Sequence, residues 1–216
     1  MAHILIIGAS KGIGLETVKY ALAEGHNVTA FARSASDVSI DSEKLTKLNG
    51  DARSTSDVEG AVANTDVVIQ ALGVPLNTKL LTGPITLFSE ATKILLPALK
   101  KAGVKRLIAV TGYGAGDSEA TIPTFQRIPF NIVFGHAYRD KSLQEEMIKN
   151  SDLDWVIARP GVLTNGRKTE RYEITTDHSK MKNGVISRAD VAHFLVNQIK
   201  DDRFVHSAPV LRGGLI

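Results

Sequence analysis

The sequence contains no cysteine. This absence excludes disulfide bonds and thiolate metal sites, and it favours a reducing, cytoplasmic location. The six histidines are scattered, and none forms a pair at the HExxH spacing of a helical metal site. We therefore expect no bound metal ion.

The chain also lacks long apolar runs and an excess of charge of one sign. Its first apolar run, residues 4–7, is far too short to cross a membrane and has no basic flank or cleavage pattern of a signal peptide. The 26 basic and 23 acidic residues are interspersed, with a formal net charge of +3. This is typical of a solvated mixed surface and does not indicate a nucleic-acid or membrane partner. We expect a small-molecule substrate and a monomer or homodimer.

What the chain does have is enough apolar residues for one buried core, since 43% of its 216 residues are hydrophobic. We expect a single domain over residues 1–216. Apolar runs alternate with amphipathic stretches, as in successive strand–helix–strand units. The pattern predicts an α/β fold, a doubly wound parallel sheet of the Rossmann type with helices on both faces in three layers.

The predicted strands are rich in Ile, Val and Leu without polar alternation, which is typical of parallel strands buried on both faces. They cover residues 3–7, 27–31, 45–48, 65–70, 106–110 and 155–158. The predicted helices cover residues 12–24, 85–101, 137–149 and 188–200. We expect Gly25 to end the first helix, Pro97 to kink or shorten the second, and Ser187 to cap the fourth.

Two stretches interrupt this alternation. Residues 114–134 contain Gly116, Pro123 and Pro129 among mixed polar and apolar side chains, and residues 164–185 are also irregular. Both follow predicted strands at their carboxyl ends, where ligands of such sheets bind. We expect both stretches to be loops that cover a substrate.

The most informative local pattern lies between the first strand and the first helix, where the chain reads Gly8-Ala9-Ser10-Lys11-Gly12-Ile13-Gly14. Gly8 permits a tight turn, Gly12 lets the backbone approach a pyrophosphate, and Gly14 lets the helix pack closely on the sheet. The helix N-terminus offers free N–H groups to the anion. A glycine-rich turn without a ligand is the alternative. The position between strand and helix predicts a cofactor site formed by Gly8, Ser10, Lys11, Gly12, Ile13 and Gly14.

The end of the second strand decides which dinucleotide is bound, because an acidic residue there would accept hydrogen bonds from the adenosine ribose of NAD. This chain has Arg33 and Ser34 at that place and no acid. A guanidinium makes charge-assisted, bidentate contacts to phosphate, and Lys11 adds a second positive charge. The pattern favours NADP, held through its 2′-phosphate, unless Arg33 is only a solvated residue at a strand end.

The GxxxGxG spacing resembles the phosphate loop of short-chain dehydrogenases/reductases, and further marks extend the resemblance along nearly the whole chain. They are Gly50-Asp51-Ala52 after the third strand, Ala71-Leu72-Gly73 after the fourth, and Arg159-Pro160-Gly161 at the end of the sixth. The last run is similar to the atypical group, which includes NmrA-like proteins and small NADPH-dependent flavin or biliverdin reductases. The resemblance implies that the cofactor also contacts Asp51, Ala52, Ala71, Leu72, Gly73 and Pro160.

In most members of that superfamily a Tyr donates a proton, and a Lys four residues later lowers its pKa and holds the nicotinamide ribose. The resemblance places that Lys at Lys141, but the position four residues earlier is Ala137. Tyr138 is the candidate proton donor, with a packing role as the alternative, and Tyr113 is a weaker candidate. Lys141 is expected to hold the cofactor, unless it is a solvated helix lysine.

The family's Ser, which would orient a substrate carbonyl, is also replaced. Thr111 supplies a hydroxyl near that place, unless it is an ordinary threonine at a strand end. The resemblance implies an NADPH-dependent reductase that mainly orients its reactants and shields them from water. The missing Tyr favours flavin- or quinone-like acceptors, which solvent can protonate. The alternative is a non-catalytic regulatory protein that senses NADP, as NmrA-like proteins do.

Overall fold

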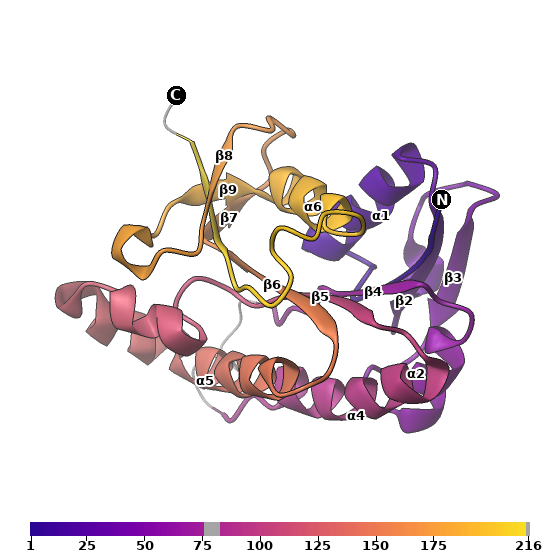
Figure 1. Ribbon diagram of the computed structural model, residues 1–216, viewed down its shortest axis with the longest axis horizontal. Coiled ribbons are helices and arrows are strands. Elements are labelled where there is room, and N and C mark those ends of the chain that lie inside the picture. The colour runs from indigo at the N-terminus through magenta and orange to yellow at the C-terminus, as the bar shows by residue number, and fades with distance from the viewer. Residues whose placement is uncertain (76–82, 215–216) are drawn as a thin grey trace.

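The computed structural model describes residues 1–75 and 83–214 of the protein (Figure 1). Its strands are β1 (His3–Ile7), β2 (Asn27–Ala32), β3 (Leu45–Asn49), β4 (Val67–Gln70), β5 (Arg106–Val110), β6 (Asp154–Pro160), β7 (Val162–Thr164), β8 (Tyr172–Thr175), β9 (Val185–Ser187) and β10 (Val210–Gly213). The helices are α1 (Gly12–Ala23), α2 (Thr55–Val62), α4 (Leu87–Ala102), α5 (Thr124–Lys149) and α6 (Arg188–Asn197), with short 3-10 turns η1 (Ala35–Asp37), η2 (Gly116–Thr121) and η3 (His178–Lys180).

The central sheet has eight strands in the order β3-β2-β1-β4-β5-β6-β10-β8. Every pairing in it is parallel except that of β10 with β8. The chain runs outward from β1 to β3 and then crosses to β4 on the other side of β1. This reversal makes the carboxyl ends of β1 and β4 the topological switch point, where doubly wound folds bind their ligands.

Helices cover both faces of the sheet, as Figure 1 shows, with α1 and α6 on one face and α2, α4 and α5 on the other. Alternate side chains of β1 explain the two layers. Ile4 and Ile6 pack with α1 and α6, while Leu5 and Ile7 pack with α2 and α4. All four are at most 2% exposed, so the strand is buried on both sides. The predicted doubly wound, three-layer fold is therefore confirmed.

The six predicted strands are all present, with ends shifted by at most two residues. The elements not predicted from the sequence are α2, the short pair β7 and β9, the strand β10 and the edge strand β8. Ser187 caps α6 as predicted, because its side chain accepts a hydrogen bond from the backbone N–H of Asp190. Among the described helices, none is both long enough and apolar enough to cross a membrane.

The prediction that residues 114–134 form a loop is wrong for its second half. The helix expected to begin at Ala137 begins at Thr124 and continues through Pro129. Phe130, Phe134 and Tyr138 follow one another at intervals of four residues, and their rings contact each other. This packing outweighs the loss of one backbone hydrogen bond at the proline.

Pro97 does not shorten the other long helix either, since α4 runs through it to Ala102. Gly103 then ends α4 in the left-handed conformation, with φ of 73°. Residues 164–185 are irregular as predicted, apart from β8 and η3.

Candidate functional site

The loop between β1 and α1 has the geometry that its glycines predict. Gly8 has φ of +87°, and a Cβ on it would lie 2.6 Å from the carbonyl oxygen of Ala71. A Cβ on Gly14 would collide with the carbonyl oxygen of Gly8. These two glycines therefore let β1, β4 and the first turn of α1 pack together, and any larger residue would separate them.

Gly12 differs from the other two because the space in front of it is open. It has φ of +62°, and the nearest atom to a Cβ built on it is Nε of Arg188, 3.9 Å away. Gly12 is also the first residue of α1, where backbone N–H groups lack intrahelical partners. Lys11 is exposed beside it, and Ser10 and Ile13 are half-buried. An anion placed there would meet free N–H groups and the positive end of the helix dipole.

The residues predicted to hold the adenosine end lie at the carboxyl ends of β2 and β3. Arg33 follows β2 directly and is exposed, and Ser34 is half-buried beside it. Asp51 follows β3, and hydrogen bonds from Arg53, with a smaller effect of the Arg33 charge, lower the pKa of its carboxyl. Arg33 and Asp51 are thus neighbours at one edge of the sheet.

The other predicted cofactor residues are mostly backbone or core groups. Ala52 is 8% exposed and packs in the core beneath α2 and α4, and Ala71 packs against Gly8. Leu72 is half-buried, and Gly73 is exposed after β4. The buried Pro160 ends β6, and its carbonyl accepts a hydrogen bond from the N–H of Tyr113.

Lys141 is on α5 and points to the end of β5. Its ammonium donates a 2.6 Å hydrogen bond to the backbone carbonyl of Thr111 and lies 5.1 and 5.0 Å from the ring centres of Phe88 and Tyr138. Burial lowers the pKa of Lys141 to about 8, although the Glu145 carboxylate acts in the opposite direction. Lys141 is therefore not a solvated helix lysine. It is a partly buried cation at the switch-point edge of the sheet.

The Thr111 hydroxyl is already hydrogen-bonded within the protein. It donates a 2.7 Å hydrogen bond to Oε1 of Glu145. A hydroxyl has one proton to donate, so in this arrangement Thr111 has none left for a substrate carbonyl. Its backbone carbonyl accepts a hydrogen bond from Lys141, so the hydroxyl and the carbonyl of Thr111 are both bonded.

Tyr138 lies over the backbone at the end of β5. A Cβ on Gly112 would be 2.5 Å from its hydroxyl oxygen, so the ring occupies the space above that glycine. Phe130 packs edge-on against the ring at 4.6 Å between centroids. Burial raises the pKa of Tyr138 to about 12, so its hydroxyl stays protonated at neutral pH and is a weak acid. Ala137, at the position of the family's Tyr, is buried in a small cluster with Phe88.

Tyr113 is committed to a different contact. It is 5% exposed, and its hydroxyl donates to the carbonyl of Thr121 and accepts from the Thr121 hydroxyl, both at 3.1 Å. Its ring packs with Ile122 and Met181. This arrangement fixes η2 against the sheet.

A buried ion-pair network beside Lys141 was not predicted from the sequence. The Arg159 guanidinium, which is completely buried, donates 3.0 and 2.5 Å hydrogen bonds to the two carboxylate oxygens of Glu145. It also pairs with Asp117. Although burial opposes ionisation of Asp117, hydrogen bonds from Arg159 and Lys149 hold its pKa at about 2. The signal for this network in the sequence is Arg159, a charged residue at the end of an apolar strand.

This network also joins the two stretches predicted to cover the substrate. Oδ2 of Asp117 in η2 lies 3.0 Å from Nε2 of His178 in η3, and Met181 packs with Ile122. The segments follow β5 and β7, and they meet beyond the carboxyl ends of the strands. Their place beside a substrate stays a prediction.

A second missed residue positions α5 itself. Asp140 is 3% exposed and accepts hydrogen bonds from the backbone N–H groups of Phe88, at 2.7 Å, and Ser89. It thereby caps the first turn of α4 from the neighbouring helix. The cap fixes Lys141 and Tyr138, which flank Asp140 on α5, against α4.

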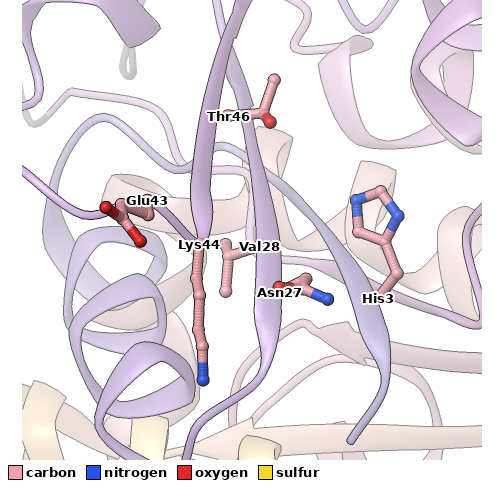
Figure 2. Close-up of a pocket in the computed structure, with 6 residues that line it drawn as sticks. All are labelled: His3, Asn27, Val28, Glu43, Lys44 and Thr46. Atoms are coloured by element: carbon pink, nitrogen blue, oxygen red, sulfur yellow. The ribbon is translucent and has the colours of Figure 1, made fainter.

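A hollow of about 220 Å³, shown in Figure 2, lies at the opposite edge of the sheet. It is lined by His3, Asn27 and Val28 at the starts of β1 and β2, and by Glu43, Lys44 and Thr46. The phosphate loop follows the other end of β1. This hollow is therefore not part of the candidate site.

Comparison with known proteins identifies the family of the chain. A family model described as NAD(P)H-binding matches residues 8–202. An uncharacterized oxidoreductase of Schizosaccharomyces pombe is 25% identical over 189 residues, which are 77% of this chain and 61% of that protein. The chloroplast protein TIC 62 of Arabidopsis thaliana is 26% identical over 94% of this chain and 34% of its own length. The chain thus spans less than two thirds of each of these relatives.

Solved structures resemble the chain over almost its full length. ChuY of Escherichia coli, described as an anaerobilin reductase, is 27% identical with a TM-score of 0.81, covering 99% of this chain and 98% of that one. A short-chain dehydrogenase/reductase of Veillonella parvula, solved with NADP, is 19% identical with a TM-score of 0.81, covering 98% and 94%. At that identity the second likeness shows the fold alone. The expected resemblance is therefore confirmed at the level of the NAD(P)H-binding family and of the fold.

Proposed function

The chain belongs to the NAD(P)H-binding family, and on that premise we propose that it is an NADPH-dependent reductase of the atypical short-chain type. The observation that carries the proposal is the geometry of the loop between β1 and α1. Gly8 and Gly14 are required by close backbone packing, whereas the space in front of Gly12 is open. That combination fits a pyrophosphate at the N-terminus of α1.

The preference for NADP over NAD rests on Arg33. It follows β2, at the place where NAD enzymes carry an acid, and its exposed guanidinium is free to contact a 2′-phosphate. Ser34 lies beside it as a further hydrogen-bonding group for the phosphate, whereas the Asp51 carboxylate is proposed to lie near the adenine ring. The Veillonella neighbour solved with NADP supports this preference only as an analogy of fold.

Lys141 is the residue proposed to hold the nicotinamide ribose. Its ammonium already lies at the end of β5, between the rings of Phe88 and Tyr138. A bound NADPH would supply the hydride. The protein's part is then to orient the cofactor, exclude water and hold the acceptor beneath η2 and η3.

The acceptor is proposed to be small and conjugated, of a flavin-, quinone- or bilin-like kind. The Thr111 proton is donated to Glu145, the Tyr113 hydroxyl is bonded to Thr121, and the Tyr138 hydroxyl is a weak acid. A conjugated acceptor does not need an acid from the protein, because water can protonate it after hydride transfer. The description of ChuY as an anaerobilin reductase supports a reductase of this kind.

The lack of a free, strong proton donor among Thr111, Tyr113 and Tyr138 also favours a second candidate, a regulatory protein that binds NADP without turning it over. The experiment that separates the two is a screen of flavins, quinones and small carbonyl compounds with NADPH, followed by the nicotinamide absorbance. A reductase consumes NADPH in the presence of an acceptor, faster than the Gly12→Val variant does. A sensor binds NADP and shows no acceptor-dependent consumption.

We further propose that the chain acts in the cytoplasm as a single domain, either as a monomer or as a homodimer. The lack of cysteine and the mixed surface charge support this proposal.

A further inference from the structure

A cavity of about 390 Å³ opens in front of the phosphate loop, on the side facing α6. Its lining comes from three places, namely the first turns of α1 and α6 and the segment after β7. The lining residues are Gly12, Glu16, Asn165, Gly166, Arg167, Lys168, Arg188 and Ala189.

The wall opposite Gly12 is cationic. Arg167, Lys168 and Arg188 line it, and Glu16 is the one acidic residue in the set. Lys168 is already occupied, because it pairs with Glu170 at 2.9 Å and lies over the Tyr20 ring at 4.5 Å. Arg188 is the cation that faces the loop, with its Nε 3.9 Å from the site of a Cβ on Gly12.

The position of Arg188 is fixed by its neighbours. It is the first residue of α6, directly after the capping residue Ser187. Its Nη1 donates a 2.8 Å hydrogen bond to Oδ1 of Asn165. A guanidinium has five N–H donors, so this contact leaves most of them available for a ligand.

The segment that carries Asn165 is fastened to the same helix end. The Asp190 carboxylate accepts hydrogen bonds from the N–H groups of Thr169 and Glu170, at 2.7 and 2.8 Å, and from the hydroxyls of Thr169 and Ser187, at 2.9 and 2.8 Å. Asp190 is 3% exposed. The cationic wall is therefore held in place before any ligand arrives, which lowers the entropic cost of binding.

We infer that this cavity is a second half of the pyrophosphate site, in which Arg188 binds the pyrophosphate on the side opposite the N-terminus of α1. The inference rests on the proposed dinucleotide function and deepens it. The α1 N–H groups would hold one face of the anion, and the guanidinium would make charge-assisted hydrogen bonds to the other. Arg188 then contributes to affinity for any ligand that carries the pyrophosphate, independently of the 2′-phosphate contact of Arg33.

The test is calorimetric titration of the full chain and its Arg188→Ala variant with two probes, NADP and 2′-phospho-ADP-ribose, which lacks the nicotinamide. We expect Arg188→Ala to weaken both probes by the same factor, roughly 10- to 100-fold, the range of a charged hydrogen bond. Arg188→Lys keeps the charge but loses the planar fork, so it should fall between the two proteins. Arg203→Ala is the control, because Arg203 is exposed, pairs with Asp201 and does not line the cavity, so it should leave affinity unchanged.

A double variant with Arg33→Ala separates the two phosphate contacts. If Arg188 binds the pyrophosphate, the losses in binding free energy for NADP should add, because the two arginines contact different groups. Unchanged affinity in a folded Arg188→Ala variant overturns the inference while leaving the proposed function intact. A loss confined to NADP, or strong coupling to Arg33, also overturns it. If the unaltered chain binds neither probe, the proposed function itself fails.

Discussion

The hydroxyl oxygen of Tyr138 lies 2.5 Å from the place where a Cβ on Gly112 would stand. The two residues therefore depend on each other, since Tyr138 can occupy this position only above a glycine. Position 112 is at the end of β5, near where related reductases carry a Ser. In this chain the tyrosine fills that space from α5, and the nearest hydroxyl in the strand end, that of Thr111, is bound to Glu145.

The first prediction tests this dependence. Gly112→Ser should force Tyr138 out of its place and lower the free energy of unfolding by about 1–3 kcal/mol, the usual cost of overpacking. Adding Tyr138→Ala should make the serine nearly harmless, so the two changes should be strongly non-additive. Urea unfolding of the four proteins measures this. Additive losses would show that the two residues do not share the space.

The second prediction concerns the choice of cofactor. Arg33→Ala should weaken NADP binding by about 1.5–3 kcal/mol, as expected for a charged hydrogen bond, and leave NAD binding nearly unchanged. Titration with both dinucleotides provides the measurement. Arg203→Ala is the control, because Arg203 is exposed and paired with Asp201 at a distant surface. Equal affinity of the unaltered protein for NADP and NAD would refute the assignment.

The third prediction concerns the open space at Gly12. Gly12→Val should abolish dinucleotide binding, because its branches project into the space proposed for the pyrophosphate. The positive φ adds strain of about 1–2 kcal/mol. Gly103→Val is a matched control, since Gly103 has φ of +73° and nothing within 4 Å of its Cβ. Calorimetry should show binding lost only in the first variant. Retained affinity would place the phosphate elsewhere.

The fourth prediction is a pH dependence of cofactor affinity. Burial lowers the pKa of Lys141 to about 8, so the group is charged at neutral pH and loses its proton as pH rises through that value. NADPH affinity should therefore be full near neutral pH and fall by about tenfold above the pKa. Lys141→Met should bind more weakly with a flat profile. The same fall in the variant would mean that another group is responsible.

The parts of the fold that could be predicted are those with a strong local signal. The buried apolar strand β1 and the glycines between it and α1 lie within a dozen residues, and together they predict the strand, the turn and the start of the helix. Local sequence also marked the cap at Ser187. The short strands β7 and β9 carry no such signal, because Val162 and Val185 are more than half exposed.

Contacts between distant residues explain the other misses. Pro129 predicts an interruption from local rules, but the aromatic residues after it pack together and keep the chain helical. Glu145 and Arg159 resemble solvated charges when read singly. Only the approach of α5 to the end of β6 makes them a buried pair.

The central claim is that this chain transfers hydride from NADPH to an acceptor. Its most direct test uses NADPH labelled with deuterium at the reactive carbon of the nicotinamide, on the face that the protein uses. Acceptors from the screen are incubated with the chain, and the products are analysed by mass spectrometry. Deuterium that reaches a flavin nitrogen or a quinone oxygen exchanges with water, so the label is followed in the nicotinamide. Hydride transfer predicts a reduced acceptor together with NADP that has lost the deuterium, formed by the unaltered chain and not by Gly12→Val. Tight NADPH binding without acceptor-dependent loss of the deuterium from the nicotinamide would contradict it and establish a sensor instead.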